Sequence, residues 1–363
     1  ASVIGTTFNA ALLAEVLGLS RERTAARLEE AIDMHLLLAQ EEVSGRYRFA
    51  HAAFRDVIYD ELASAAREAL HAKVARALER AHSAELDLHS FELARHYALG
   101  AGAGCGPQAV EYCIRAAESA ASHCAWEEAC SLWHEALELC DTLPADAPQR
   151  AWHVIAGVYE RLATTYGLMG DLQRALEAAQ AATEHVPAEE TVWLARLRRV
   201  QTLWLDAGGR RTQAETGLME AEVLLGPPGG QREPQWWQEW IDVHLSHCLP
   251  PFYDADLDQL RATASAIAEP VETHGTPLQK AQARLVTWLI DIKENRLAST
   301  DRTIGLAQEV AAAFAAAGSP DLLFAAEGAL AVTFLFCRER REEAWRHLVL
   351  HRELAREKHE FIH

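Results

Sequence analysis

Small residues recur at a fixed spacing in this sequence, and the spacing is typical of two helices that cross at close range. Ala163 is followed twelve residues later by Ala175, then by Ala182 and by Pro187, a residue type that ends helices. An earlier segment repeats the same spacing with Ala117, Ala129 and Ala136. Each segment therefore predicts a helical hairpin. Because one hairpin cannot bury its apolar face alone, such hairpins must stack on one another.

The spacing matches a tetratricopeptide repeat, in which small residues occupy positions 8, 20 and 27 of a unit of about 34 residues. Weaker copies are centred on Ala214 and Ala344. Between residues 235 and 320 we expect further helices, separated by Pro250, Pro251, Pro270, Gly275 and Pro320. We therefore predict a mostly α fold, in which residues 108–363 form an α-α superhelix of degenerate tetratricopeptide-like hairpins.

The first 64 residues have a different organisation. Residues 9–18 are amphipathic and end at Gly18, and Ser20 is placed to cap a second helix. Two short alternating runs flank Gly45 and predict a β-hairpin, which a further helix follows. These are the elements of a small winged-helix unit, assigned to residues 1–64. Residues 65–107 are predicted to be a helical spacer whose glycine-rich end, residues 100–107, is a linker.

Charge limits the partners of the chain. It has 53 acidic and 34 basic residues, a net charge of −19. Phosphate backbones and anionic lipids attract basic surfaces, so we expect no direct nucleic-acid binding and no membrane binding. Residues 1–64 alone have six arginines, no lysine and ten acidic residues.

The sequence shows no signal peptide, and its seven cysteines form no C-x-x-C pair, so free thiols and a cytoplasmic location are expected.

The order of these parts resembles one protein family. The opening ASVIG, followed by Phe8, Leu12 and Leu13, and above all the run RYRFAHAAFRDVIY from Arg46 to Tyr59, carry the resemblance. They are similar to the region after the ATPase core in signal-transduction ATPases with numerous domains. The nearest branch is the large ATP-binding regulators of LuxR type with their cyclase- and kinase-fused relatives.

The resemblance implies a nucleotide-sensing role for His51. In that family a histidine at this point contacts the β-phosphate of bound ADP and keeps the protein closed, and an imidazole can donate to phosphate. The Met-His-Asp of eukaryotic relatives is Ala50-His51-Ala52 here, so the role of that aspartate is not carried over. The alternative is a histidine that only orients the wing.

The nucleotide itself is not expected in this stretch. The sequence contains no G-x-x-x-x-G-K-[ST] loop, so no cofactor and no ATP hydrolysis are predicted for it. By the resemblance, ATP or ADP would bind an ATPase domain upstream of Ala1. The winged-helix unit would latch that nucleotide-binding domain as an intramolecular partner.

Four residues are candidates for ligand contacts in the repeat groove. The repeat positions that face inward place Glu160 and Thr164 there, and Arg196 and Arg199 on the first helix of the next hairpin. Adjacent arginines in an acidic protein favour an acidic peptide or an anionic ligand. A solvated helix face is the alternative interpretation.

The last five residues, HEFIH, match the H-E-x-x-H pattern of zinc hydrolases. His359 and His363 would share one face of a helix, with Glu360 as the base. No third ligand is suggested, so a charged terminal helix without metal is preferred.

Four cysteines are predicted to pack at helix crossings: Cys113, Cys124, Cys130 and Cys140.

Together these features predict a non-enzymatic regulatory module of a bacterial ATP-dependent signalling protein or transcriptional regulator. Its repeats would bind a protein partner or a small inducer. A constitutive protein–protein scaffold is the second hypothesis, and a zinc-dependent hydrolase built on the C-terminal histidines is the third.

Overall fold

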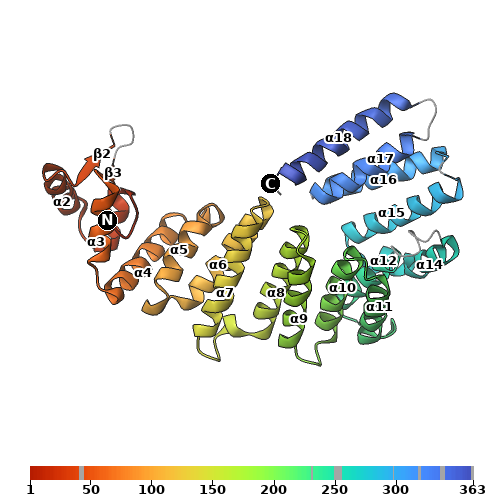
Figure 1. Cartoon of the computed structure of the whole chain (residues 1–363), viewed down its shortest axis with the longest axis horizontal. Coiled ribbons are helices and arrows are strands. Elements are labelled where there is room, and N and C mark those ends of the chain that lie inside the picture. Colours follow the sequence, from red (N-terminus) through yellow and green to blue (C-terminus); the bar gives the residue numbers. More distant parts are fainter. Residues whose placement is uncertain are drawn as a thin grey trace. The chain divides into compact units, whose positions relative to one another are not determined.

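The computed structural model describes residues 1–40, 45–229, 232–248, 256–296, 298–317, 320–335 and 340–360. The fold is mostly α and consists largely of stacked helical hairpins, as the repeat spacing predicts (Figure 1). Two compact units, residues 1–165 and 166–363, are described separately below.

The first unit begins with a small sheet and three short helices. Their bounds are β1 (Thr7–Asn9), α1 (Ala10–Leu17), α2 (Arg21–Asp33), β2 (Leu37–Ala39), β3 (Arg46–Phe49) and α3 (Ala52–Asp60). Strand β3 lies between β1 and β2 and is antiparallel to both. Gly18 ends α1 with a φ of 64°, and the Ser20 side chain accepts from the Arg23 amide at the start of α2. Both helix signals therefore act as predicted.

Three further helices continue the first unit, and the predicted glycine-rich linker lies inside it. They are α4 (Ser64–Ala81), α5 (Ser90–Leu99) and α6 (Gly106–Ser122). The segment is closely packed: a Cβ on Gly100 would lie 2.8 Å from the Ala72 amide nitrogen, and Cys105 is fully buried. Gly104 has a φ of 82°, which favours glycine. The glycines therefore serve close approach and a turn, and both predicted boundaries, after residues 64 and 107, lie within one compact unit.

A shared carboxylate joins the helices on both sides of this segment. Tyr97 on α5 and Tyr112 on α6 stack with ring centroids 5.2 Å apart. Both hydroxyls donate to Glu79 on α4, Tyr112 at 2.7 Å and Tyr97 at closer range. Burial raises the pKa of both phenols, so they remain protonated donors. This contact fixes α4, α5 and α6 against one another.

The remaining helices alternate as first and second helices of hairpins. In chain order they are α7 (Trp126–Thr142), α8 (Trp152–Leu168), α9 (Leu172–His185), α10 (Thr191–Ala207), α11 (Arg211–Leu225), α12 (Pro234–Ser246), α14 (Leu257–His274), α15 (Pro277–Glu294), α16 (Asp301–Ala317), α17 (Pro320–Leu335) and α18 (Arg341–Glu360). Helix α8 continues across the boundary between the two units.

The small residues that define the repeat are buried. Ala117 of α6 and Ala129 of α7 are fully inaccessible, as are Ala163 of α8 and Ala175 of α9. Some of the residues that were predicted to separate helices lie at helix ends. Gly275 follows α14 and Pro320 begins α17, whereas Pro250 and Pro251 lie outside the described residues.

Pro270 was expected to separate helices, and that expectation was wrong. It lies inside α14, which continues to His274. Proline removes one backbone hydrogen bond, but the helix here is supported by tertiary packing of Ile267 and Val271, which are both buried. Within the described part of the chain, no helix is both long and apolar enough to cross a bilayer.

Candidate functional site

A groove between α10 and α12 in the second unit contains the two arginines selected from the sequence. It has a volume of about 350 Å³. Its lining residues are Val192, Trp193, Arg196 and Arg199 of α10, and Gln235, Gln238, Glu239 and Asp242 of α12. Both helices are first helices of successive hairpins, which is where the sequence placed the inward-facing positions.

A buried ion pair forms the base of this groove. The Arg199 guanidinium donates to both carboxylate oxygens of Glu239, at 2.6 and 3.1 Å, and lies 3.7 Å from Asp242. The Glu239 side chain is only 7% exposed. Burial raises the pKa of Glu239 above its usual value, and the bidentate contact with Arg199 opposes that rise. Arg199 therefore binds α10 to α12.

The wall of the groove on the α12 side is fixed from a third helix. Gln279 of α15 donates from Nε2 to the Gln238 carbonyl oxygen at 2.8 Å and to Asp242 Oδ1 at 2.7 Å. Gln279 is itself buried. Because its amide makes both contacts, the backbone and one carboxylate of α12 are held in place before any ligand binds.

The open side of the groove combines a cation, an aromatic ring and two amides. Arg196 is exposed, and its guanidinium lies 5.3 Å from the centre of the Trp193 ring. Gln235 and Gln238 are exposed on the facing helix. Hydrogen-bond donors and acceptors on a rigid base suit a polar ligand.

The two arginines thus differ in environment, although the sequence presented them as equivalent ligand contacts. Arg196 is exposed and acts on Glu239 only through its charge, whereas Arg199 is mostly buried and makes the bidentate pair with Glu239. Anion recognition in this groove would therefore depend on the more accessible Arg196. Glu239 and Asp242 were not predicted as partners of Arg199. Arg199 and Glu239 are 40 residues apart, which is close to the length of one repeat. Opposite charges at matching positions of successive repeats could therefore have indicated this ion pair.

Glu160 and Thr164, the other two candidates, belong to α8 in the first unit. Glu160 is buried at 9% exposure, and the Thr164 hydroxyl donates to the Glu160 carbonyl oxygen at 3.0 Å. Arg196 and Arg199 belong to the second unit, so the four predicted residues form two pairs, each in its own unit. The role of Glu160 and Thr164 as ligand contacts stays a prediction.

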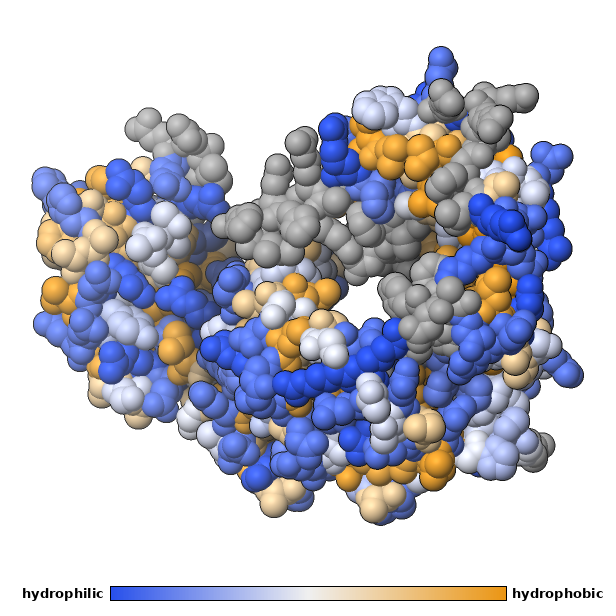
Figure 2. Space-filling view, turned by 45° about the vertical axis from the view of Figure 1, so that its right-hand side comes forward, coloured by the Kyte–Doolittle hydropathy of each residue, from blue (hydrophilic) through white to orange (hydrophobic). Residues whose placement is uncertain are grey.

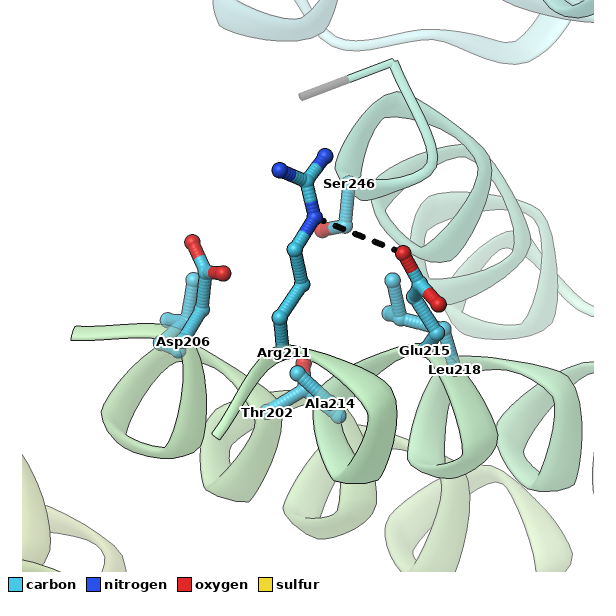
Figure 3. A pocket seen from close by; sticks show the side chains of 8 residues that line it. Thr202, Asp206, Arg211, Ala214, Glu215, Leu218 and Ser246 are labelled. Carbon is cyan, nitrogen blue, oxygen red and sulfur yellow. Dashed lines mark ion pairs between the residues drawn. The ribbon is translucent and has the colours of Figure 1, made fainter. Parts of the chain in front are cut away.

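Two other cavities differ from the α10–α12 groove in size and lining. A pocket among α10, α11 and α12 is much smaller, about 60 Å³, and Arg211 lies there between Asp206 and Glu215 (Figure 3). A cavity of about 550 Å³ lies between α1 and α4 in the first unit, and the side chains of Leu12 and Leu78 contribute to its apolar lining.

The cavity between α1 and α4 is larger and is also lined by polar residues, Asn9, Glu15, Arg21 and His82. The α10–α12 groove is taken as the candidate site because a buried ion pair and the Gln279 amide hold its polar groups in place.

His51 lies where strand β3 gives way to α3. It is the residue before the first turn of α3, its side chain makes no capping hydrogen bond, and it is exposed. Its ring meets Phe54 edge to face at 5.4 Å between centroids. The imidazole and the unpaired amides of a helix N-terminus are therefore close together, an arrangement that favours anions.

Two other histidines of the first unit are buried and form a hydrogen-bond chain. Tyr59 Oη of α3 is 2.9 Å from His71 Nε2 of α4, and His71 Nδ1 is 2.9 Å from His96 Nδ1 of α5. With both rings neutral, Tyr59 donates to His71, and His71 donates to His96. The His71 ring then donates once and accepts once, as a neutral imidazole can.

Burial also determines the state of the described cysteines. Six are free thiols, and five of these are buried. Burial raises the pKa of Cys113 and Cys248 to about 12 and that of Cys140 to about 11, so these three thiols stay protonated.

The H-E-x-x-H pattern is not part of the described site. The side chains of His359 and Glu360 and all of residues 361–363 lie outside the described residues. Within the part that the structure describes, no group of three His, Cys, Asp or Glu side chains is placed to hold a metal ion.

Comparisons with known proteins show the fold. No protein-family model matches the sequence, and a search of curated proteins gave no match. A signal-transduction ATPase with numerous domains from Pyrococcus horikoshii, which carries a tetratricopeptide-repeat sensor, has a similar structure with a TM-score of 0.53. The two are 12% identical, and the match covers 98% of this chain and 50% of that one.

A second solved structure, BtubC from P. vanneervenii, is 18% identical with a TM-score of 0.46. That match covers 67% of this chain and 92% of BtubC. At these identities the Pyrococcus likeness establishes a helical-repeat fold of tetratricopeptide type, and the chain spans half the length of that ATPase.

The buried histidines predict a dependence of stability on pH. Burial lowers the pKa of His71 from 6.5 to about 4 and that of His96 to about 3, so the unfolded chain binds more protons below pH 6.5. The contribution of these two histidines to the free energy of unfolding is fully present above pH 6.5. It decreases on acidification, by up to about 1.4 kcal/mol per pH unit for each histidine. Urea unfolding of the first unit at pH 7, 6 and 5 measures the slope. His96→Gln should reduce it, and the exposed control His123→Gln should not; equal slopes in all three proteins would contradict the prediction.

The groove predicts different consequences for its two arginines. Arg199→Ala leaves the buried Glu239 without its partner and should destabilise the second unit by about 3–5 kcal/mol. Arg196→Ala, at an exposed position, should change stability by less than about 0.5 kcal/mol. Urea unfolding compares them. Replacing both Arg199 and Glu239 by leucine should recover most of the loss, because no buried charge remains; an Arg199→Ala protein as stable as wild type would show that the pair is not structural.

Proposed function

We propose that this chain is a non-enzymatic regulatory module whose helical repeats sense a ligand in the α10–α12 groove. The observation that carries this proposal is the rigid, polar groove with Arg196, Gln235 and Gln238 on its open side. The ligand is a protein segment or a small inducer that presents acceptors to the guanidinium and amide hydrogens. The resemblance to ATP-dependent bacterial regulators, and a cytoplasmic setting for it, agree with such a role.

The groove favours sensing over a constitutive scaffold. Its base is fixed by the Arg199–Glu239 pair, and its wall is fixed by Gln279 of the next hairpin. A ligand that spans α10 and α12 therefore contacts two successive hairpins that are coupled to a third. Such a ligand shifts a conformational equilibrium only if it binds the two states with different free energies.

We also propose that residues 1–64 are a winged-helix unit that docks on a nucleotide-binding domain. Helix α3 has no buried residue, and its Phe54, Val57 and Ile58 form an exposed apolar stripe next to His51. An apolar stripe beside an anion-favouring helix start suits a domain surface that carries a bound phosphate. ADP or ATP would be held by that domain, and His51 would contact its phosphate. If this latch is coupled to the groove, ligand binding to the repeats would regulate the ATPase domain.

Site-specific photo-crosslinking tests the sensing role. A photoreactive phenylalanine derivative in place of Gln238 should form a defined adduct in cells of the source organism, because its side chain faces the occupied groove. The same residue in place of the exposed Gln180 on α9 is the matched control. Mass spectrometry of the purified protein identifies the adduct. Adding Arg196→Glu should reduce its yield, and equal adducts at both positions would refute a groove-specific ligand.

Nucleotide retention tests the latch. In a protein that joins this chain to its nucleotide-binding domain, His51→Ala should release ADP roughly 10- to 100-fold faster, the effect of losing one hydrogen bond to a charged group. Dissociation of a fluorescent ADP measures the rate, and the exposed His123→Ala is the control. Unchanged retention in His51→Ala would leave the residue with a purely structural role.

A further inference from the structure

The cavity between α1 and α4 is large enough for a small molecule, and neither the groove nor the proposed latch uses it. Its volume is about 550 Å³. Three parts of the first unit line it: α1 with the residue before it, the turn into α2 with the first residue of that helix, and the C-terminal end of α4. A ligand in this cavity would therefore contact elements that are far apart in the sequence.

The walls of the cavity are apolar. Leu12 of α1, Leu19 of the following turn and Leu78 of α4 line it, and Leu78 is buried while the other two are half-buried. On the face shown in Figure 2, hydrophobic and hydrophilic side chains are interspersed over the beginning of the chain, at the left of the view. A large apolar patch is typical of a protein docking surface, whereas a concave pocket with apolar walls and a few polar groups is typical of a small-molecule site.

Two polar side chains of this cavity are available as hydrogen-bond donors. The Asn9 oxygen already accepts from the Ala11 amide at 2.7 Å, so the NH₂ group of Asn9 is left to donate. Arg21 is exposed, forms no salt bridge with any described residue, and acts on its neighbour Glu22 only through its charge. Donors that include a cation select a ligand with an anionic acceptor.

The carboxylate of Glu15 also lines the cavity, but it is already paired. Its Oε1 accepts from Arg80 Nε at 2.9 Å and from Arg80 Nη2 at 2.7 Å, which joins α1 to α4. Because Arg80 offsets the charge of Glu15, Arg21 gives the surroundings of the cavity an excess of positive charge. The chain as a whole has a net charge of −19, so this local sign is unusual for it.

His82 adds a third polar group, and packing fixes the position of its ring. The ring is stacked on His89 with the centroids 3.6 Å apart. The stack covers one face of the imidazole and does not use its nitrogens. A neutral imidazole can donate to a carboxylate from one nitrogen, and a protonated one can donate from both.

We propose that the α1–α4 cavity binds a small amphipathic carboxylate, for which a short fatty acid is the simplest example. Its apolar body would pack on Leu12, Leu19 and Leu78. Its carboxylate would accept from Arg21, with Asn9 or His82 as a second donor. The site belongs to the first unit and does not depend on the ligand proposed for the α10–α12 groove. Because α1 and α4 both line the cavity, the bound acid would stabilise the first unit.

Photo-crosslinking with a fatty-acid probe tests the proposal. A decanoic acid derivative with a diazirine near the end of its chain is irradiated with the 363-residue protein, and mass spectrometry of the peptides locates the adduct. We expect adducts on α1 and on the end of α4, and an excess of unlabelled decanoate should remove them. Decanamide has the same apolar body without the charge. It should compete at least about 10-fold less well, because a hydrogen bond between two charged groups is lost.

Two pairs of variants test the residues assigned to the site. Arg21→Gln should weaken decanoate binding about 10-fold in calorimetric titration, whereas Arg23→Gln, at an exposed position of the same helix outside the cavity, should not. Ala81→Phe places a ring in the cavity and should abolish the adducts. Ala69→Phe, at an exposed position of α4 outside the cavity, is its control. Circular dichroism checks that each variant is folded.

Three results would overturn the proposal. Adducts that excess decanoate does not reduce would show that the labelling is not specific. Equal labelling of wild type and a folded Ala81→Phe protein would place the ligand outside the cavity. Equal competition by decanoate and decanamide would show that the cavity does not recognise a carboxylate.

Discussion

Close approach between helices is the constraint on which this structure depends. Ala117 of α6 and Ala129 of α7 are both fully buried, and residues as small as alanine let two packed helices approach each other closely. Each crossing sets the geometry of one hairpin, and stacking of the hairpins then buries faces that none could bury alone. The same constraint operates outside the repeats, where Gly100 allows α5 to end against the backbone of α4.

Polar contacts add to this packing and determine which helix faces meet in the stack. The Arg199–Glu239 pair and the Gln279 amide connect helices that belong to three hairpins. A pair so deeply placed stabilises little over an apolar pair of the same shape, but it leaves a severe penalty if broken. Its effect is therefore to specify how α10 and α12 face one another, and hence the form of the candidate groove. In the first unit, the hydrogen-bond chain from Tyr59 through His71 to His96 has a comparable role between helices.

A structural element can be predicted from the sequence when the residues that cause it act on their own turn of the chain. The ends of α1 and α2 were predicted because Gly18 and Ser20 act on their own turns. Pro270 was misjudged because packing of Ile267 and Val271 outweighs one lost hydrogen bond. The close packing of the glycine-rich segment was not foreseen, because composition does not distinguish a glycine needed for flexibility from one needed for close approach. In the groove, the sequence identified Arg196 and Arg199 but not the carboxylates of Glu239 and Asp242 that pair with Arg199.

The sequence by itself determined the class of fold and the positions of the hairpins around Ala129 and Ala175, since helix periodicity and the spacing of small residues are properties of neighbouring positions along the chain. It also determined the negative charge, which disfavours phosphate and anionic lipid surfaces. Only the tertiary structure decided which arginine of the groove is exposed, which histidines are buried and which side chains line the cavity between α1 and α4. Those properties depend on what an adjacent helix places against each side chain, and residues 40 positions apart, such as Arg199 and Glu239, become neighbours only after the hairpins stack.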